Sequence, residues 1–239
     1  MTPPNLSNQL PVSEVFYTIQ GEGRWSGFPA IFVRFQYCHL GCSWCDTRYT
    51  WDKNNHSPHQ LFTVEKLVDK IINTLPSRNT PAPHIVITGG EPMLFQENIA
   101  SLIIALKNQR FNFIEIETSG TITPSPLMMS VVDWWNCSPK LSNSLLDKHS
   151  RYIPDTLRVF SEMDNVDYKF VVRNIDDIKE MEQDFSEIIQ SDRIWLMPES
   201  ISSTSHIKRL KSIVPICLER GYVLAPRLHI LLWENQRGK

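Results

Sequence analysis

The sequence lacks the features of a membrane or exported protein. None of its apolar stretches is long enough to span a bilayer. Residues 1–15 contain neither a basic leader nor an apolar run of signal-peptide length. Low-complexity tracts and internal repeats are missing as well. These absences predict a soluble, cytoplasmic protein, and the length predicts a single domain over residues 1–239 with one sizeable core.

An excess of charge of either sign is also missing. The chain has 24 Lys and Arg residues against 26 Asp and Glu residues, which gives a formal net charge of −2. Proteins that bind nucleic acid or an anionic membrane surface usually carry a positive excess. The near balance therefore predicts neither nucleic acid nor a membrane as a partner.

Cysteine is scarce and unevenly placed. The chain has five cysteines, an odd number, whereas a secreted disulfide scaffold usually has an even number spread through a short chain. Cys137 and Cys217 lie in apolar segments and are expected to be small core residues. Cys38, Cys42 and Cys45 fall within eight residues, which indicates a metal site or a catalytic thiol.

Short β-rich segments alternate with amphipathic segments, a pattern typical of a parallel sheet covered by helices. Strands are expected at residues 30–37, 84–88, 111–117, 131–136, 168–172, 193–197 and 223–231. Helices are expected at residues 64–75, 96–110, 176–189 and 205–220, the last with a kink at Pro215 and a stop at Gly221. Residues 141–165 are expected to form a polar loop. About seven strands favour an α/β fold in the form of an open, partial βα barrel.

Each unusual polar cluster follows a predicted strand. The crowded cysteines follow the first strand, and residues 88–92 and 117–120 follow the second and third. Residues 138–140 and 197–200 follow the fourth and sixth. In α/β folds the ligand site lies at the carboxyl ends of the strands. One rim of the barrel is therefore expected to gather all five clusters.

The three crowded cysteines have the spacing C-x3-C-x2-C and supply soft thiolates from one loop, which suit an iron–sulfur cluster or zinc. A four-iron cluster has four corners, so three protein ligands leave one iron open. A structural zinc site is closed by four ligands, and His39, His56 or His59 is a candidate for the fourth. Zinc or merely structural thiols therefore remain as alternatives.

With the aromatic Trp44 just before the third cysteine, this spacing resembles the hallmark of the radical S-adenosylmethionine superfamily. The resemblance implies a partial barrel of the radical S-adenosylmethionine type and a 4Fe-4S cluster on Cys38, Cys42 and Cys45. S-adenosylmethionine would bind the open iron through its amino and carboxylate groups. Reductive cleavage of the sulfonium would then release a 5′-deoxyadenosyl radical that abstracts a substrate hydrogen, while the protein supplies orientation and excludes water.

The Gly-Gly-Glu-Pro sequence at residues 89–92 resembles the superfamily motif that holds the methionine amino group. Its two glycines permit close backbone approach to a ligand, and it lacks the Lys-Ser/Thr ending of a phosphate loop. Taken alone, it would be an ordinary tight turn. Glu117 is a candidate for a hydrogen bond to the ribose, with a satisfied carboxylate at a strand end as an equal alternative. The cofactor contacts that the resemblance implies are Trp44, Gly90, Glu117, Ser138, Pro139, Lys140, Met197, Pro198, Glu199 and Ser200.

The region before the cysteines narrows the resemblance to the 7-carboxy-7-deazaguanine synthase family. The matching segments are Phe-Tyr-Thr-Ile-Gln-Gly-Glu-Gly at 16–23, Gly-Phe-Pro at 27–29, Phe-Val-Arg at 32–34, Cys-Asp-Thr at 45–47, Ser-Pro-Lys at 138–140 and Arg-Leu-His at 227–229. Thr18 stands where Ser is usual, His39 stands where Asn is common, and residues 233–239 match only some members.

The family resemblance implies a carbon–nitrogen lyase that converts 6-carboxy-5,6,7,8-tetrahydropterin to 7-carboxy-7-deazaguanine with loss of ammonia. The product feeds the synthesis of queuosine and related 7-deazapurines. Hydrogen abstraction at C6 would start the ring contraction, and the cofactor would be regenerated. The resemblance also implies Mg²⁺, an external electron donor such as flavodoxin, and a homodimer. It assigns no protein residue as an acid or base.

The resemblance also assigns substrate and metal contacts. The implied pterin contacts are Ile19, Gln20, Gly21, Arg34, Thr88 and His229, and the implied magnesium ligand is Thr47. The Gln20 amide has the donors and acceptor needed to read a pterin edge. Arg34 alternates with its apolar neighbours and is suited to grip a carboxylate, with a surface charge as the alternative. The Thr47 hydroxyl suits a hard cation, but a Thr here is also a common helix cap. Arg227 is a further candidate at the substrate end, and the alternative for His229 is a half-buried strand histidine.

Two other functions stay open. A glycyl-radical activating enzyme would share the cluster and cofactor but act on a partner protein. Residues 20–23 and Arg34 favour a small substrate instead. The second alternative is a zinc-binding interaction module without catalytic activity, which metal analysis would distinguish because it would hold zinc and no iron or sulfide.

Overall fold

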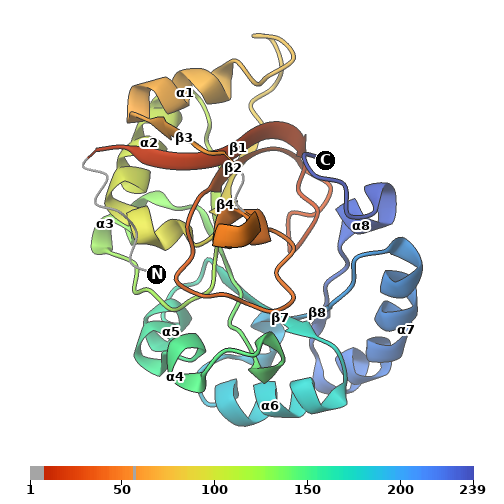
Figure 1. The fold of residues 1–239 in the computed structure, drawn as a ribbon. Helices are drawn as coiled ribbons and strands as arrows, with labels where there is room; N and C mark the ends of the chain where they lie inside the picture. Colours follow the sequence, from red (N-terminus) through yellow and green to blue (C-terminus); the bar gives the residue numbers. More distant parts are fainter. Residues whose placement is uncertain (1–7, 56–57) are drawn as a thin grey trace.

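The protein is built around one sheet rolled into an open barrel, as Figure 1 shows in a computed structural model that describes residues 8–55 and 58–239. Within these residues the sheet has nine strands in the order β3-β1-β2-β4-β5-β6-β7-β8-β9. Neighbouring strands from β2 to β9 are parallel, whereas β1 runs antiparallel to both β2 and β3. The strands are β1 Leu10–Ile19, β2 Pro29–Phe35, β3 Gln60–Phe62, β4 His84–Gly89, β5 Ile114–Thr118, β6 Trp134–Cys137, β7 Val166–Val172, β8 Ile194–Pro198 and β9 Val223–Leu224.

Helices cover the outside of the barrel (Figure 1). They are α1 Val64–Ile72, α2 Gln96–Asn108, α3 Pro126–Val131, α4 Lys148–Arg151, α5 Pro154–Ser161, α6 Ile175–Phe185, α7 Ser203–Arg220 and α8 Leu228–Trp233. Short 3₁₀ turns lie at η1 Arg48–Thr50, η2 Lys53–Asn55, η3 Pro92–Phe95, η4 Ser142–Ser144 and η5 Ser191–Arg193. Among the described residues, no helix combines the length and apolar character needed to cross a membrane.

Local sequence signals explain several helix ends. Thr63 caps α1 by accepting a hydrogen bond from the Lys66 amide. The helix α7 runs through Pro215 and ends at Gly221, which has the left-handed backbone (φ 72°) that favours glycine. The predicted stop is therefore confirmed, and the predicted kink site lies inside an unbroken helix.

Several segments differ from the prediction, among them β3 and α3, neither of which was predicted. The strand β1 was not predicted, although its position beside β2 sets the edge of the barrel. The expected polar loop at residues 141–165 contains η4, α4 and α5, because Pro154 starts a helix whose Leu157 and Phe160 are buried. The expected strand at residues 223–231 is only the two-residue β9 followed by α8. An apolar run of this length fits either element, and Pro226 separates the two.

Successive side chains of β2 point alternately to the core between sheet and helices and to the interior of the barrel. Ile31, Val33 and Phe35 pack in the main core between sheet and helices. Phe32 belongs to a small inner cluster and stacks on Phe16 with ring centroids 5.3 Å apart. Arg34 shares the inner face with Phe32, as the alternation predicts.

The loop of residues 20–28 between β1 and β2, hereafter the floor loop, lies at the amino ends of the parallel strands. Its Trp25 ring contacts His84 at the start of β4, Phe113 just before β5 and Trp134 at the start of β6, with centroids 5.6, 4.8 and 5.9 Å apart. The barrel interior is therefore closed at this end and open at the carboxyl ends of the strands.

Candidate functional site

The predicted polar clusters come together around one cavity that extends from the rim of the barrel to the floor loop. The predicted site residues that line it are Ile19, Gln20, Gly21, Arg34, Cys38, Cys42, Trp44, Cys45, Thr47, Thr88, Gly90, Glu117, Ser138, Lys140, Met197, Glu199, Ser200 and His229. Pro139 and Pro198 do not line the cavity. These residues come from five strands, the floor loop, the cysteine loop, the segments that follow β4, β6 and β8, and the helix α8, so their convergence depends on the fold.

The cysteine loop, here residues 36–51, is tied together at its two ends. The Tyr37 amide donates a hydrogen bond to the Thr50 carbonyl oxygen at 2.8 Å, and Tyr37 itself has a left-handed backbone (φ 73°). Between these ends the Cys45 amide donates to the Cys42 carbonyl at 3.2 Å. Cys42 is buried, whereas Cys38 and Cys45 are half-buried. All three sulfur-bearing side chains therefore face the cavity from one constrained loop.

The donor set fits an iron–sulfur cluster better than a single ion. Among the described residues, no three His, Cys, Asp or Glu side chains converge closely enough for one metal ion. Tetrahedral zinc with sulfurs at about 2.3 Å needs such convergence, whereas each thiolate of a cluster binds a different iron. His39 is hydrogen-bonded to the Thr121 hydroxyl at 2.8 Å, and His59 lies 3.4 Å from the Tyr37 hydroxyl. His56 lies outside the described residues.

Burial raises the pKa of two of the three cavity thiols. Desolvation raises the pKa of Cys38 to about 12, with a further contribution from the charge of Glu91. Desolvation also raises the pKa of Cys42. A thiolate here needs a positive partner, which the irons of a cluster would supply.

The two glycines at the end of β4 allow a close approach between backbone segments. A Cβ on Gly89 would lie 2.3 Å from the Phe35 backbone, and one on Gly90 would lie 2.0 Å from the Tyr37 carbonyl oxygen. The Gly90 amide donates to the Phe35 carbonyl at 3.0 Å. The two glycines therefore let the end of β4 approach the backbone of β2 and the cysteine loop, while Gly90 still lines the cavity.

Glu91 holds this turn to the end of β5. It is 1% exposed and accepts hydrogen bonds from the Thr118 hydroxyl at 2.7 Å, the Ser119 amide at 2.8 Å and the Ser119 hydroxyl at 2.5 Å. Glu91 also accepts a hydrogen bond from the Met93 amide at 3.1 Å. Both oxygens of the carboxylate thus accept hydrogen bonds from protein donors. These bonds connect the predicted cluster at residues 88–92 to the one at residues 117–120.

The Gln20 side chain is occupied by protein groups. It is 1% exposed, its amide nitrogen donates to Glu115 and, at 3.4 Å, to Glu117, and its amide oxygen accepts from the Glu22 backbone at 3.1 Å. The Gln20 amide was expected to bind a pterin edge, and these protein groups compete for the same donors and acceptor. The Thr88 hydroxyl also donates to Glu117, at 2.8 Å.

Arg34 and Thr47 line the same cavity. The Arg34 Nε atom is buried without a hydrogen-bond partner among the described residues and lies 3.6 Å from Glu14. The Tyr49 hydroxyl donates to the same Glu14 carboxylate. The Thr47 hydroxyl is 3.5 Å from the Cys45 sulfur. Arg34 Nε makes no hydrogen bond among the described residues and faces Glu14 only at ion-pair distance, which leaves the guanidinium able to bind an anion in the cavity.

A buried ion network at the floor escaped the sequence prediction. Glu22 accepts hydrogen bonds from Arg227 Nε at 2.8 Å and from Lys169. Arg227 also donates to Asp46 and, at 2.8 Å, to the Ser200 carbonyl. Burial acts to raise the pKa of Glu22, but the charges of Lys169 and Arg227 hold that pKa well below its usual value. The only sequence signal was a lysine inside an otherwise buried strand, β7.

His229 lies on α8 rather than on the expected strand. A Cβ on Gly21 would lie 2.3 Å from His229 Nδ1, and the Leu228 amide donates to the Gly21 carbonyl at 2.7 Å. Gly21 is therefore the residue that allows the histidine ring to sit against the floor loop. Burial lowers the pKa of His229, which keeps the ring neutral near pH 7.

Known proteins with related sequences define the class of this site. The family model for the Radical SAM superfamily matches residues 32–208, so the chain belongs to the radical S-adenosylmethionine superfamily. The chain is 36% identical over 233 residues to a 7-carboxy-7-deazaguanine synthase of Pyrobaculum aerophilum, with 97% of this chain and 98% of that protein covered. Within the superfamily it therefore belongs to the 7-carboxy-7-deazaguanine synthase family.

A second relative and a solved structure agree. A 7-carboxy-7-deazaguanine synthase of Halobacterium salinarum is 31% identical, covering 95% of this chain and 91% of that protein. The crystal structure of QueE from Escherichia coli superposes with a TM-score of 0.67 at 28% identity, covering 96% of this chain and all of that one. The prediction of a partial barrel of the radical S-adenosylmethionine type is confirmed.

Family membership also confirms the predicted activity. The enzyme is a lyase that converts 6-carboxy-5,6,7,8-tetrahydropterin to 7-carboxy-7-deazaguanine with loss of ammonia, in 7-deazapurine biosynthesis. Membership of the superfamily implies a 4Fe-4S cluster and S-adenosylmethionine as the cofactors.

Proposed function

We propose that the ring contraction takes place in the cavity between the cysteine loop and the floor loop, with Cys38, Cys42 and Cys45 as the cluster ligands. The observation that carries this proposal is the shared cavity itself. It places three thiols, the Arg34 guanidinium and a closed polar floor within one enclosure. When bound, the cluster and S-adenosylmethionine supply the radical, and the protein residues bind, orient and shield the reactants.

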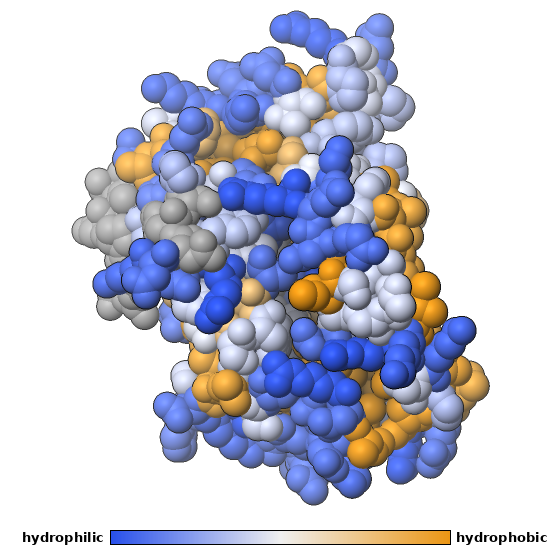
Figure 2. Space-filling view, turned by 45° about the vertical axis from the view of Figure 1, so that its right-hand side comes forward, coloured by the Kyte–Doolittle hydropathy of each residue, from blue (hydrophilic) through white to orange (hydrophobic). Residues whose placement is uncertain are grey.

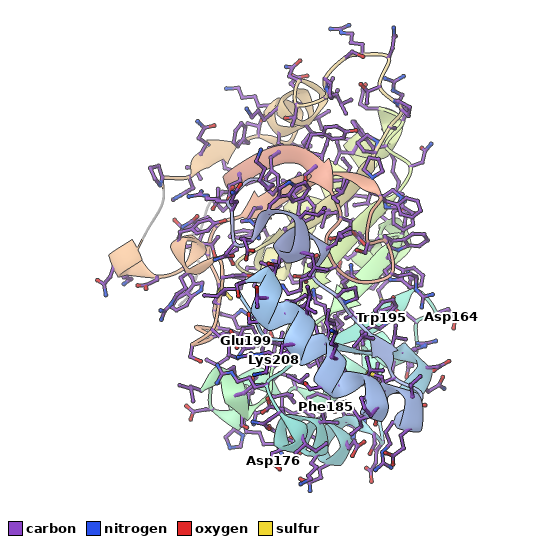
Figure 3. All side chains as sticks on the ribbon, turned by 90° about the vertical axis from the view of Figure 1, so that its right-hand side faces the viewer. Asp164, Asp176, Phe185, Trp195, Glu199 and Lys208 are labelled. Atoms are coloured by element: carbon purple, nitrogen blue, oxygen red, sulfur yellow. The ribbon has the colours of Figure 1, made fainter. Side chains whose placement is uncertain are left out.

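On the cofactor side, the rim residues are proposed to hold S-adenosylmethionine. The Trp44 ring is fixed because its Nε1 donates to the Asn143 side chain at 3.0 Å, and the Lys140 ammonium lies 5.8 Å from the ring centroid. Glu199, labelled in Figure 3, is anchored by Arg209 at 2.7 Å. The other proposed contacts are Gly90, Glu117, Ser138, Met197 and Ser200. Pro139 and Pro198 would act through the backbone, because neither lines the cavity.

On the substrate side, Arg34 is proposed to grip the pterin carboxylate. Its place on the inner face of β2 supports this role, as does its Nε atom, which makes no hydrogen bond among the described residues and lies 3.6 Å from Glu14. Thr88 and Glu117 would meet the polar edge of the ring. Ile19 and Gly21 would contribute backbone groups, and His229 would close the end of the cavity. Gln20 would contribute chiefly by fixing the floor loop, since its amide is engaged by Glu115 and the Glu22 backbone.

The Thr47 hydroxyl is proposed as a ligand of Mg²⁺, with the substrate carboxylate and water as its other oxygen ligands. Thr47 lines the same cavity as Arg34 and does not cap the following turn, since its side chain makes no cap hydrogen bond to η1. A cation there would bring the carboxylate toward both residues.

An electron donor and a second copy of the chain are proposed as partners on the basis of exposed side chains. The exposed Arg48 and Lys53 beside the cysteine loop suit an acidic electron donor such as flavodoxin. A homodimer is supported by apolar side chains exposed on and near α7 and α8, on the side that comes forward in Figure 2. These are Ile201, Ile207, Leu218 and Leu232. A single domain and a cytoplasmic location are also proposed, the latter supported by five unpaired cysteines.

Anaerobic reconstitution tests the proposal. The loaded protein should bind iron and sulfide without zinc, change its spectrum on addition of S-adenosylmethionine, and form 7-carboxy-7-deazaguanine from the carboxy-pterin when Mg²⁺ and a reduced flavodoxin are present. Arg34→Gln should raise the KM for the pterin while leaving reductive cleavage of S-adenosylmethionine measurable. Radical transfer to a partner protein instead of the pterin would support the glycyl-radical alternative.

A further inference from the structure

Trp51, at the end of the cysteine loop, lies against one of the proposed cluster ligands, Cys45. The turn η1 reverses the chain, with the Trp51 amide donating to the Arg48 carbonyl at 3.1 Å. The Thr50 hydroxyl donates to the Thr47 carbonyl at 2.9 Å, and Thr50 is fully buried. Because Thr50 is also tied to Tyr37 next to the first cysteine, the position of the tryptophan is fixed relative to the whole loop.

The indole nitrogen of Trp51 donates a hydrogen bond to the Cys45 sulfur at 3.3 Å. Its ring packs inside the loop, since a Cβ on Gly41 would lie 3.4 Å from the six-membered ring. The Arg48 guanidinium lies 5.7 Å from the ring centroid. Trp51 lines the cavity and is half-buried, so its N–H group points at sulfur in a partly desolvated setting.

We propose that Trp51 sets the reduction potential of the cluster through this hydrogen bond. An N–H donor stabilises negative charge on a thiolate, and the reduced cluster places more charge on its sulfurs than the oxidised cluster does. The hydrogen bond therefore favours the reduced form and raises the potential. One electron enters the cluster from the external donor, and no bond is made or broken in this step. The inference rests on the proposed ligand role of Cys45.

This role differs from that of Trp44, the other tryptophan in the loop. The Trp44 indole donates to the Asn143 amide oxygen at 3.0 Å rather than to a sulfur. Trp44 can therefore present its ring to the cavity, whereas Trp51 directs its N–H at a cluster ligand. The two aromatic residues divide the tasks of shaping the site and tuning the metal centre.

The test is an anaerobic redox titration of the reconstituted protein followed by electron paramagnetic resonance. Trp51→Phe keeps an aromatic ring and removes the donor, so the midpoint potential should shift to a more negative value. The matched control is Trp195→Phe. Trp195 lies near the start of β8, whereas Glu199 follows the end of that strand (Figure 3), and Trp195 does not line the cavity. That substitution should leave the potential unchanged.

A second measurement keeps the inference testable if Trp51→Phe fails to assemble a cluster. In unsubstituted protein, electron–nuclear double resonance before and after exchange into D₂O should show an exchangeable proton coupled to the reduced cluster. Equal potentials for the substituted and unsubstituted proteins would overturn the inference, as would the absence of that proton. Failure of the unsubstituted protein to assemble any cluster would instead overturn the ligand assignment on which the inference rests.

Discussion

The rim and the floor of the cavity differ in how far the protein satisfies its own polar groups. At the rim, the Cys42 thiol is buried and the Cys38 thiol is half-buried, and Arg34 Nε lacks a hydrogen-bond partner among the described residues. At the floor, Glu22 and Arg227 are paired with each other and with further charged groups. The rim is therefore completed by cofactor and substrate, whereas the floor is complete without them. Substitutions at the rim should cost chemistry, and substitutions at the floor should cost stability.

The largest expected effect is at the rim. Replacing Cys42 by Ala should abolish reductive cleavage of S-adenosylmethionine, because a cluster held by two ligands is lost or inactive. Cluster content by iron and sulfide analysis and 5′-deoxyadenosine formation by chromatography are the measurements. Circular dichroism should show an unchanged fold.

Cys217→Ala is the matched control for this experiment. Cys217 is also buried, at 5% exposure, but it packs in the core and does not line the cavity. It should retain the cluster and the cleavage activity. Full activity of the Cys42 variant would remove that residue from the ligand set.

The second effect is a loss of stability at the floor. Glu22→Gln removes the carboxylate that compensates the buried Lys169 and Arg227, and breaking a buried pair in this way typically costs about 3–5 kcal/mol. Urea denaturation of the reconstituted enzyme measures the free energy of unfolding. The control is Glu219→Gln, because Glu219 is exposed and paired only loosely with Arg220 at 3.7 Å, so its loss should change stability by less than about 1 kcal/mol. Similar values for the two variants would contradict a stabilising role for the buried ion network around Glu22.

The same contrast explains what the sequence predicts well. The rim clusters are short, contiguous motifs placed directly after strands, and the rule that ligands bind at the carboxyl ends of parallel strands brings them together. The Arg34 orientation followed from simple alternation along β2. Such signals are local in sequence, so they can be recognised without knowledge of the fold.

The floor depends on pairings that no local pattern encodes. Glu22 meets Lys169 and Arg227 across 147 and 205 residues of sequence. Their approach requires β1, which was not predicted, and α8, which was predicted as a strand. No local pattern indicates either that Gly89 and Gly90 approach the backbone of Phe35 and Tyr37, because those residues are distant in sequence.

The third effect links the floor to substrate binding. Gly21→Ala would place a methyl group 2.3 Å from His229 Nδ1, so the ring must move away at a cost of about 1–3 kcal/mol. If His229 contacts the pterin, the KM for the pterin should rise about tenfold or more while cluster content stays unchanged. A double variant with His229→Ala removes the clash, so the two effects should be clearly non-additive. Additive effects would indicate that Gly21 and His229 act independently.

The last prediction concerns Glu115, which lies behind Gln20 and is fully buried. Burial and the nearby charge of Glu117 raise the pKa of Glu115 to about 8. The folded protein therefore holds a proton here that the unfolded chain has released above its ordinary pKa of about 4.3. Stability from this group should fall as pH rises from about 4.3 toward 8, by at most about 1.4 kcal/mol per pH unit.

Glu115→Gln tests this sign because an amide does not titrate. Comparing the free energy of unfolding of both proteins at pH 5.5 and 7.5, the variant should gain relative to the unsubstituted protein as pH rises. Glu22 predicts the opposite trend, because its depressed pKa gives a contribution that is present above its ordinary pKa and lost only in acid. The two floor carboxylates should thus be separable by pH alone. If Glu115→Gln leaves the pH dependence of stability unchanged, Glu115 is ionised in the folded protein, and the Gln20 amide is then held by a charged rather than a neutral partner.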